Sequence, residues 1–146
     1  MSDTPLETIE LNVKASVESL THVTDSIENF LRRKGFRNEI VFDVQLAADE
    51  AIANVIQHGY EGREGMIRII CEVSTREIVL VVEDSAKPFN LSSVEEPRFS
   101  DSLEKRQIGG LGVYLIKKKM DQVTHEFKNG KNILTMKKRV ATDEAF

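Results

Sequence analysis

The sequence contains a single cysteine, Cys71, so it can form no intramolecular disulfide and no metal site built from several thiolates. No apolar stretch approaches the ~18 residues that a membrane-spanning helix needs, and the first residues lack the charged-then-apolar pattern of a secretion signal. No proline- and glycine-rich linker, repeat or low-complexity tract divides the chain. These absences predict a cytoplasmic protein with one domain over residues 1–146 and no contact with a membrane.

The composition is that of an ordinary globular domain. Hydrophobic residues make up 40% and charged residues 30% of the 146 residues, which is enough to bury one substantial core. The formal net charge is -4, whereas binding along a nucleic acid backbone requires a basic surface. We therefore expect no direct contact with nucleic acid.

The first half of the chain predicts one strand and two helices. Alternating apolar and polar residues from 8 to 13 are typical of a strand, and apolar residues at helical spacing from 17 to 31 predict a helix. Gly35 is expected to end this helix, because glycine adopts the left-handed conformation at little cost. A second helix over residues 39–58 is apolar on more than one side, so we expect it to be packed between neighbours.

Two hairpins are predicted in the second half. β-branched residues dominate 66–73 and 77–83, which are typical of paired strands around a short turn. The dipeptide Asn129-Gly130 is a strong hairpin signal between strands predicted at 123–127 and 133–137.

A long irregular stretch separates these hairpins. Loops beyond ~12–15 residues are usually functional or mobile, so we expect a functional or mobile loop over residues 85–108. It is followed by a helix predicted over residues 111–120. Residues 141–146 are expected to fray. The order of elements predicts an α+β fold, a two-layer sandwich with a mixed, mostly antiparallel sheet covered on one face by helices.

Three polar residues interrupt the second predicted helix at intervals of four. Glu50, Asn54 and His58 would stand above one another, because residues four apart lie one helical turn apart. The simpler interpretation is a stripe that faces water, and the spacing alone favours it. The alternative is a carboxylate and an amide that serve a buried site.

Two further features could belong to the same site. Asp84 stands where the central strand meets the long loop, either as a turn cap or as a specific acceptor. Gly110-Leu111-Gly112 opens the last predicted helix, where glycines let backbone N–H groups approach an anion and the helix N-terminus favours negative charge. The alternative there is a turn that needs glycine only for its backbone angles.

The order of these features resembles the Bergerat-type (GHKL) ATPases, and within them the anti-sigma factor serine kinases. The resemblance covers residues 9–138 and implies the Bergerat ATP-binding fold, with ATP and Mg2+ as cofactors. It implies that Glu50 is the general base, with Asp49 as the rival carboxylate. It also implies that Asn54 is the Mg2+ ligand. Asp84 would accept a hydrogen bond from the adenine amine and so reject guanine.

The nucleotide-binding set implied by the resemblance is larger. The resemblance implies that residues 85–108 form a lid, and Lys105 and Arg106 would meet phosphate oxygens when this lid closes. His58 would either join the site or cap its helix through the helix dipole. The full set comprises Asn54, His58, Asp84, Ala86, Lys105, Arg106, Gly109, Gly110, Leu111, Gly112, Val113 and Asn132.

The chain departs from this family's pattern at two positions. The first glycine box usually has a glycine two residues after the aspartate, where this chain has Ala86, so we expect a tighter floor to the adenine pocket. A threonine often follows the late glycine, where this chain has Lys131 and Asn132. We expect Asn132 to supply the hydrogen bond that the threonine would make.

By this resemblance the chain would be an ATP-binding anti-sigma factor and serine kinase in a partner-switching pathway. It would hold a sigma factor inactive, phosphorylate a small STAS-type antagonist protein and form a homodimer. The alternative is a regulatory module that binds ATP and sequesters a partner without phosphotransfer. Glu50 favours the kinase, because a pure binding module needs no base, and Ala86 favours the module. A kinase domain for a histidine or other regulator is a third option, which acid-labile phosphate would identify.

Overall fold

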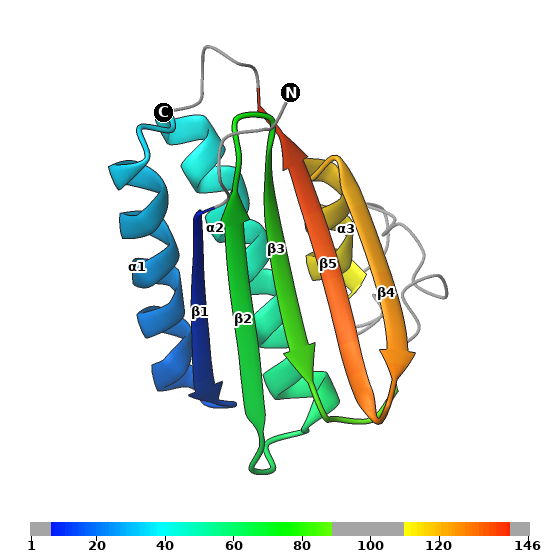
Figure 1. The fold of residues 1–146 in the computed structure, drawn as a ribbon. Helices are drawn as coiled ribbons and strands as arrows, with labels where there is room; N and C mark the ends of the chain where they lie inside the picture. Colours follow the sequence, from blue (N-terminus) through cyan, green and yellow to red (C-terminus); the bar gives the residue numbers. More distant parts are fainter. Residues whose placement is uncertain (1–6, 89–109, 141–146) are drawn as a thin grey trace.

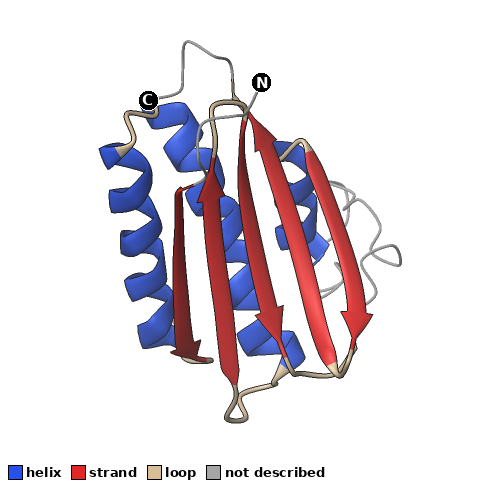
Figure 2. Cartoon of the chain, in the orientation of Figure 1, coloured by secondary structure: helices blue, strands red, loops and turns tan. Residues whose placement is uncertain are grey.

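The computed structural model describes residues 7–88 and 110–140, which form a five-stranded sheet with helices on one face (Figure 1). The two layers of the predicted α+β sandwich are clear in Figure 2. The strand order is β1-β2-β3-β5-β4, and all four pairings are antiparallel. The elements in chain order are β1 (Glu7–Lys14), α1 (Val17–Arg33), α2 (Asn38–Asn54), a π-helical turn (Val55–Gly59), β2 (Met66–Val73), β3 (Glu77–Asp84), α3 (Gly110–Lys119), β4 (Gln122–Lys128) and β5 (Lys131–Arg139).

The predicted elements agree with these bounds to within a few residues. The sheet was expected to be mixed and mostly antiparallel, and all of its described pairings are antiparallel. Most of the predicted lid and the whole of the predicted tail lie outside the described residues. Among the helices that the structure describes, none is both long and apolar enough to cross a membrane.

Helix α1 begins and ends where the sequence predicts. The hydroxyl of Ser16 accepts a hydrogen bond from the backbone N–H of Ser19 at 3.3 Å, which is a typical N-cap. Gly35 follows the helix with φ of 86°, the left-handed conformation expected after a helix end. The buried face of α1 packs against α2 and consists of Val23, Ile27, Phe30 and Leu31.

Helix α2 packs between α1 and α3, which explains why it is apolar on more than one side. Its buried residues are Ile40, Val41, Val44, Ala47, Ala48, Ala51 and Ile52. The single helix predicted over residues 39–58 changes to a π-helical turn at Val55, where the N–H of Tyr60 bonds to the carbonyl of Val55 at 2.8 Å. His58 therefore does not continue the regular spacing of Glu50 and Asn54. Such turns are frequent at functional sites.

The two central strands bury every second side chain against the helices. The buried residues of β2 and β3 in the core are Ile67, Ile69, Cys71, Val73, Ile78, Leu80 and Val82. Burial raises the pKa of Cys71 to about 12, so the thiol behaves as the small hydrophobe that the sequence predicted. The same alternation buries Asp84, which lies opposite Asn132 of β5 in the strand register.

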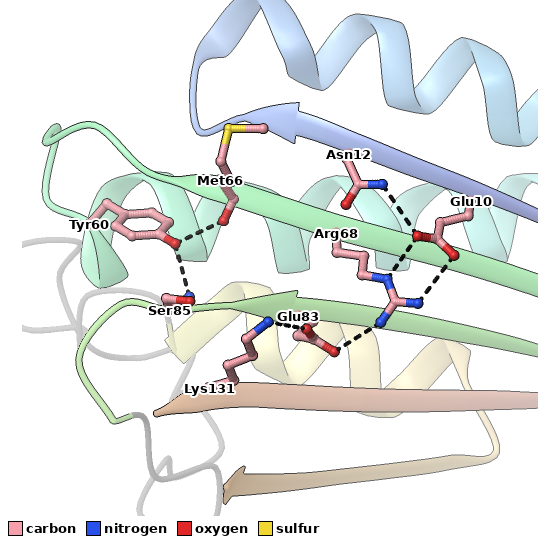
Figure 3. Close-up of polar contacts among 8 residues, drawn as sticks. All are labelled: Glu10, Asn12, Tyr60, Met66, Arg68, Glu83, Ser85 and Lys131. Carbon is pink, nitrogen blue, oxygen red and sulfur yellow. Dashed lines mark hydrogen bonds and ion pairs between the residues drawn. The ribbon is translucent and has the colours of Figure 1, made fainter. Parts of the chain in front are cut away.

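The opposite face of the sheet carries a row of ion pairs (Figure 3). Arg68 donates to Glu10 at 2.9 and 3.2 Å and lies 3.6 Å from Glu83. Lys131 contacts the same Glu83 at 3.1 Å, so the row crosses β1, β2, β3 and β5. Because side chains alternate along a strand, Asp84 lies on the helix-covered face.

Candidate functional site

A pocket lies between the helix layer and the strand ends on the helix-covered face of the sheet. Its walls are largely apolar and include Ala51, Val82, Ile116 and Leu134. Five of the predicted site residues line it, each from a different element: Asn54, His58, Asp84, Val113 and Asn132. A few convergent polar groups in an apolar cleft are typical of a small-molecule site.

Asp84 is the buried carboxylate of this pocket, with 7% of its surface exposed. Its Oδ1 accepts hydrogen bonds from the backbone N–H of Ala86 at 2.9 Å and from Nδ2 of Asn132 at 3.0 Å. Within residues 7–88 and 110–140, the structure gives Oδ2 no hydrogen-bond donor. A buried acceptor without a donor is costly, so this oxygen fits a ligand that carries an N–H group, such as the amine of adenine.

Glu50 and Asp49 face different neighbours, although they are adjacent in sequence. Asp49 accepts a hydrogen bond from the hydroxyl of Thr24 on α1. Glu50 instead faces α3, because a Cβ placed on Gly112 would lie 2.6 Å from its Oε2. Of the two carboxylates, Glu50 is therefore the one beside the glycine turn, although it is not among the residues that line the pocket.

Both carboxylates hold their protons more tightly than exposed ones do. Burial raises the pKa of Glu50, and the negative charge of Asp49 raises it further. Burial also raises the pKa of Asp49, against the opposite effect of the hydrogen bond from Thr24. A raised pKa makes the Glu50 carboxylate a better proton acceptor, as a general base requires.

The glycine turn lies directly against the predicted metal ligand and base. The Cβ position of Gly112 is 2.6 Å from the Glu50 carboxylate and 3.5 Å from Nδ2 of Asn54, so only glycine fits without displacement. The amide oxygen of Asn54 is a hard donor of the kind that Mg2+ accepts alongside water and phosphate. Gly110 begins α3, whereas the predicted residues Lys105, Arg106 and Gly109 and the side chain of Leu111 lie outside the described part of the chain.

Ala86 lies close to Gly59, the residue that follows His58. His58 lines the pocket, whereas Ala86 does not. A Cβ placed on Gly59 would lie 3.1 Å from the Ala86 methyl group, so this methyl occupies space that Gly59 leaves open. The tighter pocket floor predicted from Ala86 and its part in nucleotide binding stay predictions.

Tyr60 is a residue of this region that the sequence interpretation missed. Its hydroxyl donates to the carbonyl of Met66 at 2.8 Å and accepts from the N–H of Ser85 at 2.9 Å (Figure 3). A Cβ on Gly65 would overlap the Tyr60 ring, so glycine is required there. The hydroxyl of Tyr60 thus links the end of the π-helical turn to the segment that follows Asp84. A tyrosine directly after the His58-Gly59 pair was the available signal.

Comparison with known proteins adds an independent finding. Residues 13–138 match the family model described as the histidine kinase-like ATPase domain. The chain is 29% identical over 133 residues to the anti-sigma F factor of Clostridium kluyveri, with 90% of this chain and 92% of that protein covered. It is 28% identical over 135 residues to the serine-protein kinase RsbW of Listeria innocua serovar 6a, with 89% and 85% covered.

The fold also resembles that of a solved structure. The crystal structure of the RsbU and RsbW domains of a Mycobacterium tuberculosis protein superposes with a TM-score of 0.63 at 16% identity. The match covers 93% of this chain and 32% of that chain, and it extends the likeness to the arrangement of the sheet and helices.

Proposed function

The chain belongs to the histidine kinase-like ATPase domain family, and from this premise we propose that it is an ATP-dependent serine kinase that also acts as an anti-sigma factor. It binds ATP between the helix layer and the sheet and transfers the γ-phosphoryl group to a serine of a small antagonist protein. The names of the anti-sigma F factor and the RsbW kinases support this direction, since both match most of the chain.

The observation that carries the proposal is the meeting of three separate sequence features. Asp84 and Asn54 line one pocket, and Gly112 of α3 lies against both Asn54 and Glu50. Base recognition and metal binding would therefore share one pocket, and proton acceptance by Glu50 would take place beside it, at the glycine turn. This arrangement suits a nucleotide with its base at the strand ends and its phosphates at the start of α3.

The proposed reaction assigns each residue one task. The serine hydroxyl attacks the γ-phosphorus, the bond to the oxygen bridging to the β-phosphate breaks, and Glu50 takes the serine proton. Asp84 would accept a hydrogen bond from the adenine amine, and the amide oxygen of Asn54 would hold Mg2+. The metal supplies charge neutralisation in such transfers, where positioning matters more than covalent help.

The proposed partners follow from the relatives and from the charge of the chain. They are a sigma factor and a STAS-type antagonist protein, and a homodimer is part of the same proposal. The net charge of -4 supports protein partners over nucleic acid, and a cytoplasmic location suits a regulator of a sigma factor.

Phosphoryl transfer is the activity that tests the proposal. The protein is incubated with Mg2+, ATP labelled at the γ-phosphate and STAS-type antagonist proteins, and we expect acid-stable label on an antagonist serine. Removal of Mg2+ with EDTA should abolish the label, and excess unlabelled ATP should dilute it while GTP does not. If calorimetry detects ATP binding but no label reaches any antagonist, the result would favour a non-catalytic module. Absence of ATP binding would contradict both the kinase and the module.

Gly112→Ala should separate catalysis from stability. The added methyl meets the Glu50 carboxylate at 2.6 Å, so Glu50 must move, and we expect transfer to fall by roughly tenfold or more. The fold should be kept, because alanine favours a helix over glycine by about 1 kcal/mol. The measurements are initial rates of label transfer and thermal unfolding. Lys117→Ala, at an exposed position of the same helix, is the control, and equal rates in the two variants would contradict the proposed role of the turn.

A further inference from the structure

Asn132 and Asp84 are the two buried polar side chains among the residues whose burial the structure describes. Asn132 is 4% exposed and lies opposite Asp84 in the register of β3 and β5. A buried amide must find partners for its polar atoms. The partners of Asn132 connect Asp84 to a histidine that neither the sequence interpretation nor the proposed function includes.

The nitrogen of the Asn132 amide faces three oxygen atoms. Nδ2 lies 3.0 Å from Oδ1 of Asp84, 2.9 Å from the carbonyl of Lys87 and 3.3 Å from the carbonyl of Ala86. Because these oxygens act as acceptors, an amide oxygen in the same place would be repelled by all three. The orientation of the amide is therefore dictated by its surroundings.

This orientation decides which proton His125 carries. Oδ1 of Asn132 faces away from Asp84 and lies 2.9 Å from Nε2 of His125 on β4. Since an amide oxygen can only accept, Nε2 of His125 must bear a hydrogen. His125 also lines the pocket, as Asp84 and Asn132 do.

The three side chains together fix which oxygen of Asp84 the pocket presents to a ligand. Oδ1 of Asp84 is occupied by Asn132 and by the N–H of Ala86, so the carboxylate presents Oδ2 as the oxygen without a donor among the described residues. The same amide ties the carbonyls of Ala86 and Lys87 to β5. Rotation of the Asp84 carboxylate out of this orientation would break the two hydrogen bonds that Oδ1 accepts from Asn132 and Ala86.

We propose that His125 and Asn132 are positioning residues that hold Asp84 in the orientation that selects a 6-aminopurine. His125 donates to Asn132 and locks its amide, and the locked amide donates to Asp84. The inference rests on the proposed function, because it concerns recognition of the adenine base. It assigns to His125 a role in base selectivity that acts through Asn132.

Calorimetric titration with Mg-ATP and with magnesium inosine triphosphate, which has a 6-oxo group, tests the proposal. His125→Phe removes the donor, and we expect about fivefold weaker ATP binding and a lower ratio of ATP to inosine triphosphate affinity. His125→Gln can still donate an N–H, so it should restore most of both. Asn132→Asp places an acceptor against Asp84 and should weaken ATP binding about tenfold.

The controls separate this inference from the proposed function. Glu126→Gln alters the next residue of β4, which is exposed, and should leave both affinities unchanged. If the wild type fails to bind Mg-ATP, the proposed function fails and the inference with it. If the wild type binds and selects ATP while His125→Phe matches it, the inference alone fails. Equal losses in His125→Phe and His125→Gln would show a packing role and also overturn it.

A spectroscopic measurement on the wild-type protein tests the proposal even if the variants do not fold. The nitrogen chemical shifts of His125 distinguish the two neutral tautomers, and we expect the hydrogen on Nε2. The side-chain amide protons of Asn132 should exchange slowly with solvent, because their nitrogen is buried against three acceptors. A neutral His125 with its hydrogen on Nδ1 would contradict the proposed chain.

Discussion

Glu50→Gln is expected to lower phosphoryl transfer to the antagonist by roughly 10²–10⁴-fold, the usual contribution of a general base. Glutamine has nearly the same shape but cannot accept the serine proton. Mg-ATP affinity should stay within about threefold of the wild type, because Glu50 is not among the residues that line the pocket. Initial rates of label transfer and calorimetric titration measure the two quantities separately. A variant that keeps the wild-type rate would contradict the assignment of the base.

The same substitution should not destabilise the fold at neutral pH. Burial and the charge of Asp49 raise the pKa of Glu50, so the folded protein binds this proton more tightly than the unfolded chain does. This contribution to the free energy of unfolding is present below the unfolded pKa and is lost as pH rises through the folded pKa. Glutamine carries no charge to desolvate, so Glu50→Gln should melt at or above the wild-type temperature at pH 7. The difference should vanish below about pH 4.

Asp49→Asn is the matched control, because it makes the same chemical change one residue away. Asp49 bonds to Thr24 rather than facing the glycine turn, so transfer should largely persist. Removal of its charge should also lower the pKa of Glu50 and move the acidic limb of the pH–rate profile to lower pH. A loss as large as that of Glu50→Gln would instead make Asp49 the base.

Local sequence pattern was sufficient to predict most of the fold. Alternation of β-branched residues predicted β2 and β3 almost to the residue, and Asn129-Gly130 predicted the last hairpin, where both residues have positive φ. The π-helical turn after Asn54 could not be predicted in this way. One extra residue in a single turn leaves the spacing of apolar residues along the helix almost unchanged. The residue that follows this turn is Tyr60, whose hydroxyl bonds to Met66 and also to Ser85 beyond the end of β3.

The candidate site was likewise predicted only in part from the sequence. Helix period and strand alternation indicate which face each side chain uses, but spacing alone favoured a stripe that faces water. The prediction that Asn54, Asp84 and the glycine turn share one site came from the resemblance to the GHKL ATPases. The orientation of Asp49 depends on Thr24 of another helix, which no local pattern encodes. The bonds of Asn132 to His125 depend on the pairing of β4 with β5.

Asp84→Asn is expected to reverse the base preference of the pocket and not merely to weaken binding. The N–H of Ala86 and Nδ2 of Asn132 both require an acceptor at the position of Oδ1, so the new amide must turn its oxygen toward them. Its NH2 group then takes the place of Oδ2 and faces the adenine amine. Both groups are hydrogen-bond donors, so no hydrogen bond forms between them. Loss of one charge-assisted hydrogen bond costs ~1.5–3 kcal/mol, so we expect Mg-ATP affinity to fall roughly ten- to a hundredfold.

Magnesium GTP makes this prediction specific, because guanine presents a carbonyl where adenine presents an amine. The amide of Asp84→Asn can donate to that carbonyl, so GTP should bind as well as ATP or better, as measured by parallel calorimetric titrations. Glu83→Gln is the matched control: it neutralises the adjacent carboxylate, which pairs with Arg68 and Lys131 on the other face (Figure 3), and should change neither affinity. Equal weakening of both nucleotides would indicate a distorted pocket and contradict the fixed amide orientation from which the reversal is derived.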